Sequence, residues 1–271
     1  MKDVTLNNGV VMPMIGLGTF PMHRWELVRA VYYAKRIGYR NFDTAWKYGN
    51  ERALNWAMKF SMMNRKEYFL TSKIEWVQKQ QGSVRKALTG TLQRLGTNYL
   101  DLYLIHWPKS GYYIDMWKEM EELYQEGLIR AIGVSNFLQP HLERLLAECS
   151  MIPAVNQIEL NPLNTQKTLI SFCKDQGIQM MAHTPLAKGS PLLFNNEILK
   201  DIASHHHKSV AQIVLRWIIQ QNIIICPKSS HKENLKSNID IFDFLLSEEE
   251  CAILDTLNQD LYFYNDPHTT L

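Results

Sequence analysis

The chain has 271 residues, of which 46% are hydrophobic and 21% charged, and its formal net charge is +2. This composition is typical of a globular protein with a large core, and the length suits one eight-unit α/β barrel of about 250 residues. So small a charge, without a block of basic residues, argues against nucleic acid or a membrane surface as a partner.

The ends of the chain and its cysteines indicate a cytoplasmic protein. The longest apolar stretch, residues 213–226, is interrupted by Arg216 and falls short of the ~18 apolar residues of a membrane-spanning helix. The first ten residues lack a signal-peptide core. The four cysteines form no CxxC pair, which predicts reduced thiols. Three consecutive histidines, His205 to His207, would point in different directions on a helix, so no metal site is predicted.

A hairpin is expected first in chain order, because Asn8-Gly9 is a strong two-residue turn signal between apolar runs in residues 4–14. Short β-rich runs then alternate with amphipathic stretches such as residues 83–96 and 114–127. This alternation predicts a (β/α)8 barrel, capped at the bottom by the hairpin, as a single domain over residues 1–271. The expected strands cover residues 14–20, 40–45, 68–74, 99–107, 129–137, 154–160, 178–186 and 223–229.

Polar side chains interrupt the predicted strands near their C-terminal ends. In a parallel barrel those ends meet at one mouth, where barrel enzymes keep their active sites. Each residue alone also has a structural explanation, such as a buried ion pair or a hydrogen-bonded core histidine. Their common phase along the strands favours a shared site formed by Asp43, Lys73, His106, Asn136, Gln157, His183 and Lys228.

Four residues of this region fit carbonyl reduction. Tyr48 is a phenol with an ordinary pKa near 10, and a nearby ammonium lowers such a pKa. We therefore expect Lys73, held by Asp43, to make Tyr48 a better proton donor, while His106 donates a hydrogen bond to the substrate oxygen. No side chain supplies a hydride, so the reaction requires a cofactor.

Eight motifs resemble those of the aldo-keto reductase family, in the same order and over nearly the whole chain. They are GLGTF (16–20), FDTAWKYGNE (42–51), TSK (71–73), LYLIHWP (102–108), GVSNF (133–137), NQIELNP (156–162), TPLAKGS (184–190) and PKSS (227–230). The resemblance implies a (β/α)8 barrel and NADPH-dependent reduction of aldehydes or ketones, with a catalytic set of Asp43, Tyr48, Lys73 and His106. No G-x-G-x-x-G opens a helix, so a Rossmann fold is not expected.

The resemblance also implies which residues bind NADP(H) and the substrate. Lys228 and Ser229 would grip the adenosine 2′-phosphate, the lysine as a point charge. The nicotinamide carboxamide would be held by Ser135, Asn136 and Gln157, although the first two could cap the following helix, either instead or as well. The other expected cofactor contacts are Gly18, Thr19, Asp43, His183, Thr184, Pro185, Leu186, Lys188, Ser190, Ser230, Asn234 and Asn238. The expected substrate contacts are Phe20, Tyr48, His106 and Trp107.

Three positions depart from the family pattern. His183 stands where a tyrosine usually stacks on the nicotinamide, and imidazole offers less area for stacking. Asn234 stands where many members have an arginine, so phosphate recognition loses a planar, permanently charged fork. Glu75 stands where many relatives have an aromatic pocket wall. With a short segment after the last helix, these differences predict an open, rather polar pocket for small carbonyl compounds.

Two functions from other classes stay open on the sequence. The same fold could serve as an NADP(H)-binding sensor or regulatory subunit with little turnover. Alternatively, Lys73 could attack a carbonyl as the nucleophile of a Schiff-base lyase. Cofactor-dependent turnover would exclude the lyase. We expect a monomer or a weak homodimer that acts on a small-molecule carbonyl substrate.

Overall fold

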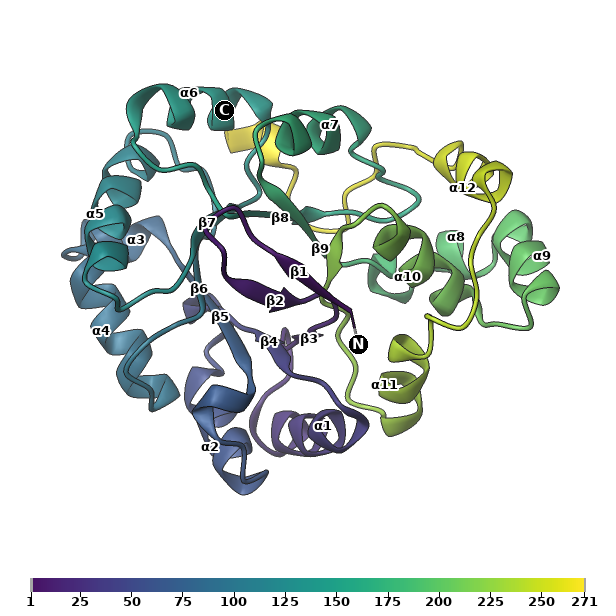
Figure 1. Cartoon of the computed structure of the whole chain (residues 1–271), viewed down its shortest axis with the longest axis horizontal. Coiled ribbons are helices and arrows are strands. Elements are labelled where there is room, and N and C mark those ends of the chain that lie inside the picture. The colour runs from purple at the N-terminus through teal and green to yellow at the C-terminus, as the bar shows by residue number, and fades with distance from the viewer. Residues whose placement is uncertain (1, 271) are drawn as a thin grey trace.

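The structure is a computed structural model that describes residues 2–270; residues 1 and 271, the ends of the predicted domain, lie outside the described residues (Figure 1). Its main sheet has eight parallel strands, each hydrogen-bonded to the next in chain order. Every strand lies inside a run predicted from the sequence, so the barrel prediction is confirmed. The strands are β3 (Leu17–Gly18), β4 (Asn41–Asp43), β5 (Phe69–Ile74), β6 (Leu102–Ile105), β7 (Ile132–Ser135), β8 (Val155–Glu159), β9 (Gln179–His183) and β10 (Ile224–Ile225).

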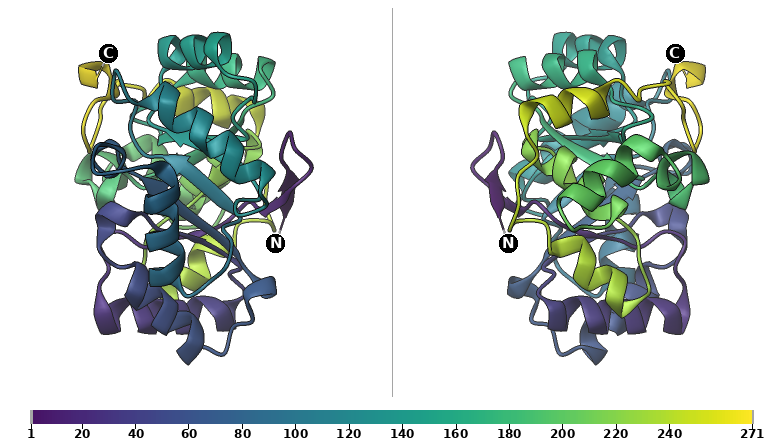
Figure 2. Two further views of the ribbon diagram at one scale, coloured as in Figure 1. Left: turned by 90° about the vertical axis from the view of Figure 1, so that its left-hand side faces the viewer. Right: turned by 90° about the vertical axis from the view of Figure 1, so that its right-hand side faces the viewer.

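The predicted N-terminal hairpin is present. Strands β1 (Asp3–Thr5) and β2 (Val11–Pro13) pair antiparallel, and Gly9 takes the left-handed φ of 83° that the turn requires. The hairpin crosses the centre of the barrel in Figure 1. In Figure 2 it lies on the side opposite the C-terminal segment, so the hairpin marks the bottom and the C-terminal segment lies toward the mouth.

The first and last parallel strands are joined at the seam of the barrel. Ile15 forms a parallel bridge with Ile225, whose amide N–H also donates to the carbonyl of Met14 at 2.9 Å. The chains approach so closely here that a Cβ on Gly18 would lie 2.7 Å from the carbonyl oxygen of Cys226. Gly18 therefore fits a position where only hydrogen can stand between two backbones.

Helices alternate with the strands and surround the sheet (Figure 1). Both helices predicted in detail are confirmed: α4 (Val84–Leu95) begins after Ser83, whose hydroxyl accepts from the amide of Lys86, and α5 (Tyr113–Gln125) is followed by the left-handed Gly127. The other α-helices are α1 (Arg24–Ile37), α2 (Glu51–Phe60), α3 (Trp76–Gln80), α6 (Gln139–Glu148), α7 (Lys167–Asp175), α8 (Pro191–Phe194), α9 (Glu197–His205), α10 (Val210–Gln220), α11 (Lys232–Ile239) and α12 (Glu248–Asp255).

Side-chain alternation along the strands decides which residues reach the barrel interior. On β6, Leu102 and Leu104 belong to the inner apolar cluster, whereas Tyr103 and Ile105 pack in the layer between sheet and helices. His106 continues the inward series at the C-terminal end of the strand. On β5 the inward series starts at Phe69 and leads through Lys73 to Glu75. The core thus ends at the mouth in polar side chains.

Three further expectations concern the described part of the chain. None of its helices has the length and apolar character needed to span a membrane. All four cysteines are free thiols. Residues 2–270 contain no group of three His, Cys, Asp or Glu side chains arranged to hold a metal ion, and His206 instead contacts Glu250 at 2.8 Å.

Candidate active site

A buried lysine forms the centre of the site. Lys73, on β5, is completely buried, and its ammonium lies 2.6 Å from Asp43 Oδ1 and 3.2 Å from the Tyr48 hydroxyl. It also donates to the carbonyl of Thr44 at 3.1 Å. Asp43 ends the adjacent strand β4, and Tyr48 lies on the short 3-10 helix η1 (Trp46–Tyr48) that follows it. The three residues predicted to act together are therefore in contact.

The electrostatics of this trio correct one sequence-based expectation. Burial raises the pKa of Tyr48 to about 12, and the charge of Lys73 opposes this rise without overcoming it. The expected net lowering below the ordinary value of 10 is thus wrong. Burial also opposes the charge of Lys73, but Asp43 and Tyr48 raise its pKa above the ordinary value, so the side chain is an ammonium.

Asn50 connects the strand ends around the trio, a role that the sequence analysis missed. Its buried amide donates to the Thr19 carbonyl at 3.1 Å and to the Met22 carbonyl at 3.0 Å, and its Oδ1 accepts from the Thr44 hydroxyl at 2.6 Å. Thr19 is itself completely buried, and its hydroxyl donates to the Asp43 carbonyl at 2.9 Å. The Thr19 side chain therefore supports the framework, and its expected contact with the cofactor stays a prediction.

His106 lies beside Tyr48, with ring centroids 5.7 Å apart and an interplanar angle of 79°. On its other side, Nδ1 of His106 lies 2.7 Å from Oε1 of Glu75. Burial lowers the pKa of His106, whereas Glu75 raises it. The sequence analysis named Glu75 but not its contact with His106; its two-residue spacing from Lys73 could have placed it on the same face of the strand.

The residues expected at the carboxamide meet at the ends of β7, β8 and β9. Asn136 donates from Nδ2 to the His106 carbonyl at 2.9 Å and to Ser135 Oγ at 3.1 Å. Gln157 donates to Asp43 Oδ2 at 2.9 Å and so joins this group to the catalytic trio. Helix α6 starts at Gln139 without a side-chain cap, so the alternative that Ser135 and Asn136 cap it is wrong.

His183 is fixed through both ring nitrogens. Nε2 lies 3.0 Å from Asn136 Oδ1, and Nδ1 lies 3.0 Å from the Thr184 hydroxyl. Because Asn136 uses its amide hydrogens elsewhere, its oxygen accepts and Nε2 of His183 carries the proton. Burial, with the charges of Lys73 and His106, lowers the pKa of His183 to about 3, so the ring is neutral.

The C-terminal segment covers part of the mouth, contrary to the expectation of an open pocket. The Glu159 carboxylate accepts hydrogen bonds from the backbone amides of Phe263 at 2.7 Å and Tyr264 at 3.1 Å. The Tyr264 ring lies 6.1 Å from the Phe20 ring and 6.2 Å from the His183 ring. Although short, the segment thus reaches the expected substrate and nicotinamide positions.

The loop after β9 contacts the C-terminal segment that covers part of the mouth. Lys188 donates to the Phe263 carbonyl at 2.7 Å, and its ammonium lies 3.6 Å from the Tyr264 ring centroid. Ser190 caps the short helix α8 by accepting from the amide of Leu192. Of the other cofactor candidates in this loop, Pro185 is buried and Leu186 half-buried. The polar side chains of Thr184, Lys188 and Ser190 therefore all have partners within the protein.

The candidate phosphate loop follows β10. Lys228 is exposed and lies 3.2 Å from Glu26 Oε1 on α1, a pairing that the sequence analysis missed. Ser229 and Ser230 are buried beside it. On α11, Asn234 is exposed and Asn238 buried. The loop therefore offers one cation, already balanced by a carboxylate.

The expected substrate side of the mouth is aromatic. Phe20 is exposed and packs against Tyr48 with ring centroids 5.0 Å apart. Trp107 is half-buried, 6.5 Å from the His106 ring. Phe20, Tyr48, His106 and Trp107 therefore form a continuous series of ring contacts around the reacting groups.

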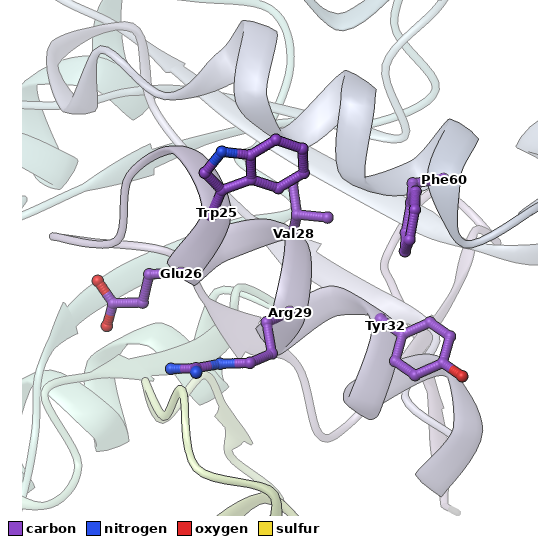
Figure 3. A pocket seen from close by; sticks show the side chains of 6 residues that line it. All are labelled: Trp25, Glu26, Val28, Arg29, Tyr32 and Phe60. Atoms are coloured by element: carbon purple, nitrogen blue, oxygen red, sulfur yellow. The ribbon is translucent and has the colours of Figure 1, made fainter.

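A separate groove with a volume of about 410 Å³ lies between α1 and α2. It is lined by Trp25, Glu26, Val28, Arg29, Tyr32 and Phe60 (Figure 3). Glu26 and Arg29 extend to one side in this view, whereas Tyr32 and Phe60 lie on the other. Through Glu26 the groove adjoins the Lys228 loop, but none of the four catalytic candidates lines it.

The fold and the site together define a parallel-barrel enzyme whose mouth carries Asp43, Tyr48, Lys73 and His106. The sequence pattern of the aldo/keto reductase family matches residues 14–259, and the chain belongs to this family. It is 46% identical over 263 residues to a glyoxal reductase of Bacillus subtilis, covering 96% of this chain and 94% of the relative. It is 38% identical over 266 residues to a methylglyoxal reductase of Escherichia coli K12, covering 97% and 96%.

A solved structure has the same architecture. It is an aldo-keto reductase enzyme, MGS-M4, from a Medee basin deep-sea metagenome library, with a TM-score of 0.91 and 37% identity over 98% of each chain. Family membership establishes an oxidoreductase that acts on carbonyl compounds.

Proposed function

We propose that the protein is an NADPH-dependent reductase of small aldehydes and oxoaldehydes, with Tyr48 as the proton donor. The contact between the Tyr48 hydroxyl and the Lys73 ammonium, 3.2 Å long, carries this proposal. A cation at this distance stabilises the phenolate that remains after proton transfer. The reductases of glyoxal and methylglyoxal among its relatives support the substrate class.

The chemistry of the donor set fits NADP(H). Lys228, with a side chain 37% exposed, is a cation available to a phosphate, and the neighbouring Ser229 and Ser230 offer hydroxyls. For a carboxamide, Ser135 offers its hydroxyl hydrogen, Gln157 its amide oxygen and Asn136 the second lone pair of Oδ1, since the Asn136 amide hydrogens donate to His106 and Ser135. When bound, the nicotinamide supplies the hydride that no side chain can supply.

The residues of the chain then have distinct tasks. His106 and Tyr48 orient the carbonyl oxygen, and Tyr48 gives it a proton as negative charge develops there. Lys73 remains protonated and stabilises the resulting phenolate. Asp43 holds Lys73 at 2.6 Å and compensates its buried charge. The C-terminal segment at Tyr264 helps to exclude water from the mouth.

The state of Lys73 argues against the Schiff-base lyase. An amine must lose its proton before it attacks a carbonyl, and the contact with Asp43 raises the pKa of Lys73. The complete catalytic set likewise argues against a sensor without turnover. We further propose that residues 1–271 act as one domain, as a cytoplasmic monomer or weak homodimer.

Cofactor oxidation with glyoxal, methylglyoxal and a panel of other small aldehydes and quinones tests the proposal. We expect turnover with NADPH on the oxoaldehydes, and a matched Tyr48→Phe variant that binds NADPH but turns over poorly. If neither NADPH nor NADH were oxidised with any carbonyl compound, the result would contradict the enzyme assignment and favour the sensor.

A further inference from the structure

Glu75 and His106 follow the neighbouring strands β5 and β6, which are paired so that Ile74 lies beside Ile105. Both side chains continue the inward series of their strands and meet at the mouth. Oε1 of Glu75 lies 2.7 Å from Nδ1 of His106, and the two side chains are only 5% and 9% exposed. A carboxylate is thus buried against the imidazole proposed to bind the substrate oxygen.

The short distance locates a proton. Both atoms are buried and have no other hydrogen-bond partner, and two bare acceptors repel each other at 2.7 Å. His106 and Lys47 lower the pKa of Glu75 although burial opposes this, so Glu75 is ionised. The proton therefore belongs to Nδ1. The ring N–H is not aligned with the oxygen, so the contact is a close electrostatic one rather than a linear hydrogen bond.

A neutral imidazole carries one proton, so a protonated Nδ1 leaves a lone pair on Nε2. Nε2 of His106 makes no hydrogen bond within residues 2–270, and it is the ring nitrogen left for a ligand. A lone pair cannot donate to a carbonyl oxygen. With this tautomer, His106 can donate from Nε2 only as an imidazolium.

We propose that Glu75 is a positioning residue that holds the Nδ1 proton of His106, so that Nε2 accepts a hydrogen bond when the ring is neutral and donates one only when it is charged. The consequence for catalysis rests on the function proposed above. No proton leaves His106 in the reaction, because Tyr48 supplies the proton to the substrate oxygen. His106 donates a hydrogen bond to that oxygen, and adds a positive charge, only when its ring is charged.

The surrounding charges make Glu75 decisive for the charged form. The cations that act on His106 are Lys73 on β5 and Lys47 on η1, and both disfavour the imidazolium. Tyr48 and His183 also face it from η1 and β9. Glu75 is the carboxylate in contact with the ring, so its neutralisation removes the anion that favours the imidazolium.

The test combines NMR of the His106 ring nitrogens in the full chain without cofactor with kcat/KM for methylglyoxal reduction as a function of pH. Glu75→Gln keeps shape but removes charge, whereas Glu75→Leu also removes the acceptor. Asp101→Asn is the matched control, since this buried carboxylate pairs with Arg65 and Arg130 at the opposite end of β6.

In the wild-type protein we expect the neutral His106 ring to be protonated on Nδ1. The Gln variant should lower the pKa of His106 by about 1 to 3. The inflection of kcat/KM on the acid side of the pH profile should move to lower pH together with this pKa. The Leu variant should transfer the neutral ring's proton largely to Nε2, whereas the Asp101 control should change neither property.

A wild-type ring protonated on Nε2 would overturn the proposal, as would an unchanged His106 titration in the Gln variant. The wild-type spectrum decides the tautomer even if neither variant folds. Absence of turnover by the wild-type protein would refute the proposed reductase instead, since the NMR measurements do not depend on activity.

Discussion

Replacement of Lys73 by methionine tests the core of the site. The variant removes a cation 3.2 Å from the Tyr48 hydroxyl and keeps a long apolar side chain in a completely buried position. At an effective dielectric constant of about 20, the Coulomb interaction with a phenolate at this distance is roughly 5 kcal/mol. Asp43, also in contact with Lys73, opposes this effect. An opposite charge nearby typically lowers a pKa by about 1 to 3, or about 1.4 to 4 kcal/mol.

Tyr48 should therefore become a weaker acid than its present pKa of about 12 implies, and its phenolate should lose its stabilising charge. We expect kcat for aldehyde reduction to fall by about 10²- to 10⁴-fold, the range of general acid catalysis. The affinity for NADPH, followed by fluorescence quenching, should change little. The assay is steady-state oxidation of NADPH at saturating aldehyde between about pH 6 and 9.

Stability has to be separated from catalysis, because Lys73→Met leaves Asp43 buried without its cation. Removal of one partner of such a pair costs about 3–5 kcal/mol, lessened here by the remaining bond from Gln157. The double variant Asp43→Asn/Lys73→Met removes both charges and should recover most of the stability but not the activity. The reasoning would be refuted by a folded Lys73→Met enzyme whose kcat stays within about tenfold of wild type.

Four other substitutions make further predictions. Tyr48→Phe should reduce aldehyde turnover by at least about a hundredfold with little change in NADPH binding, whereas near-normal turnover would exclude Tyr48 as the acid. NADPH should be preferred over NADH in kcat/KM at fixed ionic strength, and Lys228→Ala should flatten this preference. Asn234→Arg should sharpen the preference for NADPH by roughly tenfold to a hundredfold, because a charged hydrogen bond contributes about 1.5–3 kcal/mol. A wild-type preference for NADH would contradict the role of the Lys228 loop. Asn50→Ala should lower the free energy of unfolding in urea by about 1–3 kcal/mol for each buried partner left unsatisfied, and an unchanged midpoint would show that its bonds are dispensable.

Much of the architecture could be predicted from the sequence, because strand and helix periods differ and parallel strands place their C-terminal ends together. Asp43 and Lys73 were identified in this way, and their contact follows from the adjacency of β4 and β5. The pairing of Glu75 with His106 required the register of two neighbouring strands, which polarity alone does not fix. The seven polar strand ends were therefore found, but, apart from the pairing of Lys73 with Asp43, not their individual partners.

Other features depend on distances that no sequence pattern encodes. The net direction of the Tyr48 pKa results from burial and the charge of Lys73, which oppose each other, and only the packed site determines which is larger. The Lys228–Glu26 pair joins residues from opposite ends of the chain. Coverage of the mouth by the C-terminal segment depends on Glu159 accepting two backbone amides, a contact that segment length does not predict.

The bridge between Ile15 and Ile225 has a consequence for synthesis of the protein. The two residues are about 210 positions apart, so β3 leaves the ribosome long before its partner exists. At roughly 5–20 residues per second, that edge waits on the order of 10 to 40 seconds with unpaired backbone groups. A ribosome that stalls within α10 would release an open sheet prone to pair with other chains. The last stretch of translation thus decides whether the nascent protein closes or aggregates.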